Sequence, residues 1–428
     1  MFLIYLSMFA ICCILSYVKE KRFFTPLVLF GVVWNIFPAI SCFGLLGLNQ
    51  PSYKTHFLIV LAWVFFLVGY FIPFKNKSAT GSTKRRANYT ILAFGNLLAL
   101  LIMLPHFFES VKILNAYGWS YLRNIAGETY SSSTIVNIIN DWFTEPFIIA
   151  SSSYLAFSFF TKKRIPIVLF ALIIVNVLVS CVIFAARALL IKIAFFIIFA
   201  LLFLTGFKIL RKLSKQRKII VSVVIIGLVL IAIYITSLRM NESDMFGTFL
   251  DSAIPYYIGP FSLIDYYIND PSYSLIGINY TFGGSFFGFA YNILRAVFYV
   301  LFGAEYNGTD YILTLVTQNN SPIGGGHYIN AASTALYPML RDFGVAGVVF
   351  GFFIIGLVFN MLQKRKGRYA NDDFYSMVYV FMCYILFKSS MSYEPLSPSF
   401  IFTIIFCWII CLHGNNNGKI QKLFAENV

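Results

Sequence analysis

The chain has 428 residues, of which 59% are hydrophobic and 11% are charged. Its mean hydropathy is +0.79. A soluble protein needs roughly 25% charged residues to cover its surface, so this composition excludes an ordinary water-soluble enzyme. Apolar runs of about 18 to 24 residues recur along the chain, and that length spans a bilayer core of roughly 30 Å. The sequence therefore predicts an all-α fold, a polytopic integral membrane helix bundle with about eleven transmembrane helices.

The first apolar run, residues 1–17, could be a signal peptide or a retained helix. A signal peptide carries its positive charges before the apolar stretch and a small-residue cleavage site after it. Here Lys19, Lys21 and Arg22 follow the run, and no such site comes after them. We expect a retained helix with its N-terminus on the outer side of the membrane.

Basic clusters separate the apolar runs and set the topology. Most of the 32 Lys and Arg fall in six clusters, and positive residues favour the cytoplasmic side of a membrane. The net charge of +15 is therefore mostly a topology signal and does not point to nucleic acid. The C-terminus is expected to be cytoplasmic. The clusters lie at 19–22, 75–86, 162–164, 208–218, 364–368 and 419–422. The crossings are expected at 1–18, 26–48, 57–74, 89–106, 142–160, 165–186, 188–206, 219–238, 336–360, 374–391 and 398–412.

Two long connections remain on the outer side, at 107–141 and 239–335. The second is far longer than an ordinary connection, which predicts a functional role. It contains two apolar stretches, 254–268 and 285–303, that could be further crossings. A connection between two crossings would be cytoplasmic, yet residues 269–284 contain no Lys or Arg. We expect re-entrant or interface-lying helices there, within a single transmembrane domain, 1–428.

The cysteines and short motifs give no sign of a metal or a cofactor. All seven cysteines lie inside apolar runs, which predicts buried thiols, no disulfide and no zinc site. The nearest glycine pattern, GGSFFG at 283–288, is too weak to indicate a nucleotide. We expect no cofactor.

Several cations lie at one depth, near the outer ends of predicted crossings. They are Arg187, Lys192, Arg239, Arg341 and Lys388. Long basic side chains can snorkel to lipid phosphates, which would explain any one of them. A set of arginines also suits a membrane-embedded anion, because the planar guanidinium binds two phosphate oxygens at once. A lipid-linked diphosphate fits both the charge and the depth.

The outer connection 239–335 is rich in aromatic residues. Between 251 and 311 many Phe and Tyr, Tyr256 among them, alternate with Asp and Asn. Aromatic faces can stack on sugars while Asp and Asn accept their hydroxyls, so a glycan is one interpretation. An interfacial aromatic belt is the other. Arg239 and Arg295 are the only basic residues of the connection, so it would not attract a polyanion.

One stretch, GGGHYINAASTALYPMLRDFGVAGVVFG at 324–351, runs from a glycine-rich loop into the predicted crossing at 336–360. It places His327, Asn330, Arg341 and Asp342 where the chain enters the membrane, although ionisable side chains are costly there. The leading glycines allow close approach of the backbone. The later glycines are three or four residues apart and offer a small-residue face for helix packing.

This stretch resembles the O-antigen polymerase family, the oligosaccharide repeat unit polymerases. The similar features are a Gly-Gly pair followed by Asn, a helix that opens with an aromatic residue and Pro, and then Asp-aromatic-Gly-x-x-Gly. In this chain they are Gly325, Gly326, Asn330, Tyr337, Pro338, Asp342, Phe343, Gly344 and Gly347. The layout is similar over essentially the whole chain, with Arg187 at the turn of a helix pair. Some members carry an Arg followed eleven positions later by Gly in outer loops, and no outer-face Arg here has that spacing.

The resemblance implies a metal-independent glycosyltransferase of the bacterial inner membrane that works on the periplasmic face. Its donor and acceptor would be undecaprenyl-diphosphate-linked oligosaccharides, and its product an O-antigen or a related surface polysaccharide. Membrane lipid is the other implied partner, together with a protein that regulates chain length. An O-antigen ligase uses the same donor with a different acceptor and is the nearest alternative. A lipid-linked oligosaccharide flippase or transporter is the alternative from another class, but such proteins show two similar halves with short loops.

The chemistry implied by this resemblance suits the residues of the stretch. Fixed cations such as Arg341 can stabilise a departing diphosphate. The acceptor hydroxyl needs a general base, and His327 is the histidine that lies between the aromatic connection and the Arg341 segment. A structural loop histidine is the alternative. Asp342 could be the base instead, or it could pair with Arg341 and so make a poor base. The predicted catalytic residues are His327, Arg341 and Asp342, and the predicted substrate-binding residues are Arg187, Lys192, Arg239, Tyr256, Arg295 and Asn330.

Overall fold

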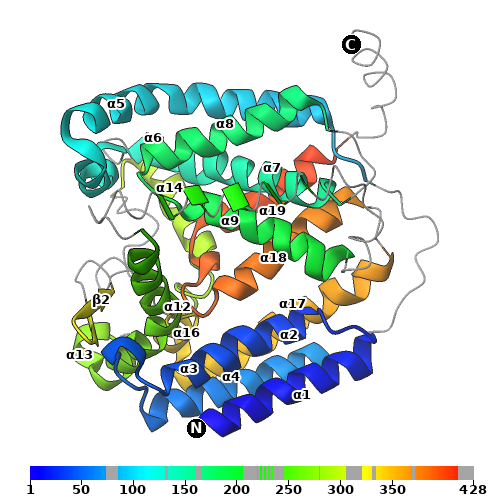
Figure 1. Cartoon of the computed structure of the whole chain (residues 1–428), viewed down its shortest axis with the longest axis vertical. Helices are drawn as coiled ribbons and strands as arrows, with labels where there is room; N and C mark the ends of the chain where they lie inside the picture. Colours follow the sequence, from blue (N-terminus) through cyan, green and yellow to red (C-terminus); the bar gives the residue numbers. More distant parts are fainter. Residues whose placement is uncertain are drawn as a thin grey trace. The chain divides into compact units, whose positions relative to one another are not determined.

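The computed structural model is helical over most of its length (Figure 1). It describes residues 1–73, 85–130, 134–160, 165–205, 245–278, 280–304, 321–329, 334–368 and 372–412, with scattered positions between 219 and 234. The chain forms two compact units. Unit 1 comprises Met1–Lys77, Leu250–Gly367 and Ile385–Pro398, and unit 2 comprises Ser78–Phe249, Arg368–Tyr384 and Ser399–Val428.

The protein is an all-α membrane protein. Within the described ranges, 4 helices are long and apolar enough to cross a membrane: Phe2–Glu20, Tyr53–Phe71, Tyr89–Arg123 and Val345–Arg365. Shorter apolar helices of 10–17 residues accompany them: Pro26–Ser41, Ile167–Ile183, Ala188–Leu204, Gly288–Phe302 and Pro398–Ile410. The prediction of a helical membrane protein is therefore confirmed, and the count of about eleven crossings stays a prediction.

Unit 1 is built from helices and one small hairpin. Its elements are α1 (Phe2–Glu20), α2 (Pro26–Gly31), α3 (Phe37–Ser41), α4 (Tyr53–Phe71), α12 (Met245–Asn269), α13 (Pro271–Ser274), α14 (Gly288–Phe302), β1 (Ser321–Gly324), β2 (His327–Ile329), α16 (Leu336–Phe343) and α17 (Val345–Arg368). Aromatic rings fill the space between α2, α4 and α17: Phe30 stacks on Phe66 with ring centroids 3.7 Å apart, and Trp34 lies 4.7 Å from Phe352. A Cβ at Gly69 or Gly356 would overlap a carbonyl oxygen of the facing helix, so these glycines let α4 and α17 approach closely.

The basic ends of three helices meet at one end of unit 1. Lys19 at the end of α1 donates to the carbonyl of Tyr70 on α4 at 2.5 Å and to Asn360 Oδ1 on α17 at 3.1 Å. Gln363 of α17 donates to Glu20 at 3.3 Å. The basic clusters 19–22 and 364–368 are therefore at the same end, as the topology prediction requires. We call this the basic end of unit 1.

The other end of unit 1 carries polar contacts between α1, α4 and α12. Tyr5 and His56 share a hydrogen bond of 2.8 Å between the hydroxyl and Nδ1. Asp265 of α12 accepts hydrogen bonds from the backbone N–H of Ser52 at 2.8 Å and from the Thr55 hydroxyl at 2.7 Å. A carboxylate at the first turn of a helix satisfies N–H groups that have no partner within the helix. Asp265 thus ties α12 to the beginning of α4.

Unit 2 packs its helices around one buried helix. The elements are α5 (Tyr89–Tyr130), α6 (Thr134–Ile139), α7 (Glu145–Ser158), α8 (Ile167–Ile183), α9 (Ala188–Phe199), the unit 2 part of α18 (Asp373–Lys388) and α19 (Pro398–Ile410). Every residue of α7 from Pro146 to Ser158 is buried. Residues 107–130, expected as part of a connecting loop, continue α5 as helix, with a kink at Gly118 (φ 83°).

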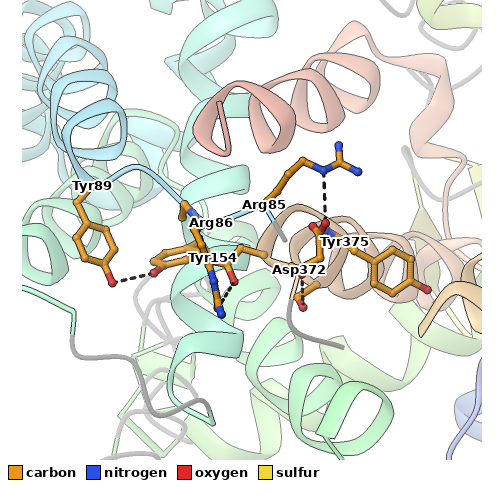
Figure 2. Close-up of polar contacts among 9 residues, drawn as sticks. Arg85, Arg86, Tyr89, Tyr154, Asp372 and Tyr375 are labelled. Atoms are coloured by element: carbon orange, nitrogen blue, oxygen red, sulfur yellow. Dashed lines mark hydrogen bonds and ion pairs between the residues drawn. The ribbon is translucent and has the colours of Figure 1, made fainter. Parts of the chain in front are cut away.

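The beginning of α18 is held by a polar cluster, which Figure 2 shows. Asp372 accepts from the backbone N–H of Tyr375 at 3.0 Å and so caps α18. Its other oxygen lies 3.4 Å from Arg85 Nε. Arg86 Nη1 lies 3.8 Å from Asp373, which also accepts from the Ala87 N–H at 3.0 Å. The segment that leaves the basic cluster 75–86 is thereby fixed to α18.

Candidate functional site

The candidate site of unit 1 is centred on α16, a short helix that precedes the long helix α17. The sequence predicted one continuous helix over 336–360, but the chain breaks at Gly344, where φ is 60°. A left-handed residue ends a helix, and glycine adopts that conformation readily. A Cβ at Gly347 would overlap the carbonyl oxygen of Met339, and one at Gly351 would overlap the Met339 side chain. The predicted small-residue face of α17 is thus used to pack α16 against its first turns.

Arg341 lies inside unit 1 rather than at its surface. The residue is 2% exposed, and its Nη1 donates to the carbonyl oxygen of Leu275 at 2.7 Å. The Arg341 carbonyl accepts from the backbone N–H of Thr281 at 3.0 Å. A guanidinium in this position does not snorkel to lipid headgroups. Its positive charge is held in the protein, beside the end of α17 that is opposite the basic end.

Arg341 contacts Leu275, whereas the carboxylate of its neighbour Asp342 contacts residues 281–286. Its carboxylate accepts from the Thr281 hydroxyl, from the Ser285 N–H at 3.0 Å and from the Phe286 N–H at 2.6 Å. The residue is fully buried. Three donors on one buried carboxylate leave little room for a substrate hydroxyl, so these contacts support an anchoring role over the catalytic role expected from the sequence.

The surroundings of Asp342 include a buried tyrosine from the connection between α18 and α19. Burial raises the pKa of Tyr393, and the nearby Asp342 carboxylate raises it further. The Tyr393 ring stacks on Phe286 with centroids 5.5 Å apart. Lys388, one of the cations predicted at the outer edge, pairs with Glu394 in this connection. Apart from their short separation in the chain, no sequence pattern predicts that Glu394 contacts Lys388.

His327 lies on a hairpin attached to the same end of unit 1. Strands β1 and β2 pair antiparallel with Gly324 opposite His327, and Gly324 also bridges to Leu48. Asn49, just before α4, donates its N–H to the Ile323 carbonyl at 2.7 Å. The glycines at 324–326 all have positive φ, and a Cβ at Gly325 would overlap the carbonyl of Leu46. This close approach explains the glycine run, and it leaves His327 half-exposed at the strand end.

The hairpin and α16 are both attached to α12. The side chains of Ile323 and Ile329 face Gly259 of α12, and the Tyr267 ring of α12 lies 5.4 Å from the Tyr337 ring of α16. The Tyr337 hydroxyl donates to the Ser274 carbonyl at 3.1 Å. One helix therefore supports the elements that carry His327 and Arg341.

Two further predicted substrate-binding residues, Tyr256 and Arg295, are more peripheral in unit 1. Tyr256 is exposed on α12. Arg295 lies on α14 with its guanidinium carbon 5.5 Å from the centre of the Tyr291 ring. Asn330 and Arg239 lie outside the described residues.

The predicted cations of unit 2 form a separate group. Lys192 of α9 is 6% exposed, and its Nζ lies 3.7 Å from Glu145 Oε1 at the start of α7 and 5.5 Å from the centre of the Tyr384 ring. Arg187 is the half-buried residue that precedes α9. Glu145 was missed from the sequence, although an acid at the beginning of a predicted crossing is a signal for a buried cation elsewhere. Lys192 and Arg187 belong to unit 2, whereas Arg341 and His327 belong to unit 1.

A resident metal ion finds no ready site in the part of the chain that the structure describes. No group of three or more His, Cys, Asp or Glu side chains is arranged there to hold one. The elements attached to α12 offer a fixed cation, Arg341 on α16, a histidine, His327 on β2, and an aromatic segment held by Asp342. Comparisons of the chain with protein-family models, curated proteins and solved structures find no match.

Proposed function

We propose that the chain is a membrane glycosyltransferase that polymerises undecaprenyl-diphosphate-linked oligosaccharide repeat units on the periplasmic face of a bacterial inner membrane. The observation that carries the proposal is Arg341. It is a buried guanidinium on a short helix at the mouth of a spanning helix, at the end opposite the basic end. Burying a charge there costs free energy, so such a charge is typically kept for binding or catalysis. The diphosphate of a lipid carrier is an anion that lies at the same depth, at the membrane boundary. The similarity of the 325–347 motif to repeat unit polymerases supports the same conclusion.

In the proposed reaction, Arg341 stabilises the departing diphosphate. The acceptor hydroxyl oxygen forms a bond to the anomeric carbon of the donor sugar while the bond from that carbon to the carrier phosphate breaks. The electron pair leaves with the diphosphate, where a fixed cation is favourable. The guanidinium stays charged at any accessible pH, and its fork can bind two phosphate oxygens. At Nη1 a phosphate oxygen would replace the carbonyl of Leu275 as acceptor.

His327 is the proposed general base that takes the proton from the acceptor hydroxyl. It is half-exposed on a rigid hairpin that is attached, like α16, to α12. Asp342 is proposed as a positioning residue, because its three hydrogen bonds fix the aromatic segment beside Arg341. The cations of unit 2, Arg187 and Lys192, together with Arg239, stay proposed contacts of the carrier diphosphate, and Tyr256, Arg295 and Asn330 proposed contacts of the glycan.

The test is a polymerisation assay with purified protein and lipid-linked repeat units. A general base contributes about 10²–10⁴-fold to a rate, so His327→Ala is expected to lower turnover by that factor while lipid-linked substrate still binds. His327→Gln keeps hydrogen-bonding groups but cannot take a proton, so its turnover should fall as far as that of His327→Ala. His106→Gln on α5 is the matched control and should be near wild type.

Three outcomes would decide against the proposal. Near-normal rates with His327→Gln would remove the histidine from proton transfer. A single transfer to an acceptor that is not lipid-linked would favour a ligase. Movement of intact lipid-linked oligosaccharide across a bilayer without any new glycosidic bond would favour a flippase.

A further inference from the structure

An exposed aromatic group surrounds the break between α16 and α17. Phe282 is 77% exposed, and its ring lies 6.2 Å from Tyr280 and 6.3 Å from Phe343. The Tyr280 hydroxyl would be 3.3 Å from a Cβ at Gly344, and Val345 on the other side of that glycine is 50% exposed. We call Tyr280, Phe282, Phe343 and Val345 the rim patch.

The outward position of Phe282 is fixed by buried contacts. Phe282 has φ 47°, a left-handed conformation that a bulky residue rarely adopts. On both sides of it the backbone is held: Thr281 donates its N–H to the Arg341 carbonyl at 3.0 Å, and Ser285 and Phe286 donate theirs to Asp342. A strained residue that exposes its ring to the outside, on a backbone anchored this firmly, indicates that the ring has a partner outside the unit.

The length of α17 sets the depth of the rim patch. The apolar span Val345–Arg365 has 21 residues, which at 1.5 Å per residue is about 31 Å. This matches the hydrocarbon thickness of roughly 30 Å. Gln363, near the far end of the span, lies at the basic end of unit 1, in contact with Glu20. Val345 is consequently at the opposite membrane boundary. Tyr280 lies against the adjacent Gly344, and the Phe282 ring contacts both Tyr280 and Phe343, so the three rings are at about the same depth.

We propose that the rim patch inserts into the bilayer interface, with lipid glycerol and upper acyl groups as its partner. It thereby holds α16, and Arg341 with it, at headgroup depth. The chemistry favours lipid over a sugar: the patch consists of two Phe, one Val and one Tyr, and the carboxylate nearest to it in the chain, Asp342, is turned inward to Thr281, Ser285 and Phe286. Aromatic residues at this depth are typical of membrane boundaries. The inference is independent of the proposed glycosyltransferase activity.

The experiment places a nitroxide spin label on Phe282→Cys in full-length protein, reconstituted in vesicles of phosphatidylethanolamine and phosphatidylglycerol. Relaxation by oxygen, which concentrates in lipid, is compared with relaxation by a water-soluble nickel chelate. We expect the label at 282 to collide at least several-fold more with oxygen than with nickel. Tyr328→Cys on the hairpin, 63% exposed, is the matched control, and its label should respond mainly to nickel. The parent protein gives the background from the seven native cysteines.

A label at 282 that responds to nickel as strongly as the label at 328 would overturn the inference. Protection from nickel that occurs only when a soluble oligosaccharide is added would also overturn it and would identify a sugar platform. Since Phe282 lies in a strained turn, Val345→Cys in the first turn of α17 serves as a second variant that does not depend on that turn. It should give the same oxygen preference, and a nickel preference at 345 would contradict the assigned depth.

Discussion

Two regions of this chain contain arginine and aspartate residues close together, but the residues pair with each other in only one of them. In unit 1, Arg341 and Asp342 are neighbours in sequence, yet Arg341 donates to the Leu275 carbonyl and Asp342 accepts from Thr281, Ser285 and Phe286. In unit 2, Arg85 and Arg86 pair directly with Asp372 and Asp373, although the partners of each pair are 287 positions apart in the chain (Figure 2).

Burial differs between the two regions as well. The aspartates of both regions are buried, but the Arg85 and Arg86 side chains are 41% and 39% exposed, whereas Arg341 is 2% exposed. Exposed pairs are screened by solvent and stabilise a fold little, while buried groups cost much when they lose a partner. Substitutions of Arg341 and Asp342 should therefore lower the stability of the protein strongly, whereas substitutions of Arg85 and Arg86 should lower it little.

Asp342→Ala is expected to have the largest effect on stability. It leaves one hydroxyl and two backbone N–H groups without their acceptor in a buried place, and each such loss costs about 1–3 kcal/mol. We expect the free energy of unfolding in detergent to fall by roughly 3 kcal/mol or more. Asp342→Asn keeps an acceptor oxygen and should lose less. If Asp372→Ala, which removes one cap and one exposed pair, is equally damaging, the contrast between the regions fails.

The role of Asp342 shows where the sequence was informative and where it was not. Composition was enough for the all-α membrane class, and the basic clusters at 19–22 and 364–368 do meet at one end of unit 1. The partners of Asp342 come from residues 281–286, about sixty positions away, and no local pattern could identify them. The catalytic prediction for Asp342 therefore rested on its neighbours in sequence, which do not include these partners.

Local signals were present for other features that were missed. Gly344 follows an Asp-Phe pair and could have indicated a helix end within 336–360. The glycine run at 324–326 was recognised as permitting close approach, but the hairpin that it closes was not predicted. His56 lies in the first turn of α4 and shares a hydrogen bond with Tyr5. In each case a tertiary contact decided the local structure.

Arg341→Lys should have the next largest effect. A charge-assisted hydrogen bond is worth about 1.5–3 kcal/mol, and a lysine places a point charge where the guanidinium fork reaches the Leu275 carbonyl. We expect a loss of about 2 kcal/mol in unfolding free energy, together with a fall in polymerising activity in the correctly inserted protein. Arg85→Lys is the matched control in unit 2 and should stay within about 0.5 kcal/mol of wild type, as surface changes do. Full activity of Arg341→Lys would show that the arginine has a structural role and does not bind the diphosphate.

Tyr393 gives the unit 1 region a dependence of stability on pH. Its pKa is raised by burial and by Asp342. Up to the unfolded pKa of about 10, both states keep the phenol neutral and stability is unaffected. As the pH rises further, the unfolded state releases the proton while the folded state retains it, so stability is lost until the folded pKa is reached.

The matching measurement compares wild type with Tyr393→Phe between pH 9 and pH 11. Phe cannot ionise, so the variant should lose about 1.4 kcal/mol less per pH unit above 10. Both proteins keep their other titrating groups, which cancel in the difference. Parallel stability curves over this range would show that folding does not raise the pKa of Tyr393.

Arg86→Ala is expected to have the smallest effect on stability, and it tests the expectation that exposed pairs in unit 2 contribute little. The Arg86–Asp373 pair is 3.8 Å long and its arginine is 39% exposed, so its contribution is about 0.2–1 kcal/mol. Asp373 keeps a hydrogen-bond donor after the change, because the Ala87 N–H still donates to it at 3.0 Å.

The difference in stability between Arg86→Ala and wild type should shrink further in about 1 M salt, where the screening length falls to roughly 3 Å. The Asp342→Ala difference should not shrink, since its hydrogen bonds are buried. Thermal unfolding of both variants at low and high salt separates the two regions, and a salt-independent loss of several kcal/mol for Arg86→Ala would mean that the exposed pair is structural after all.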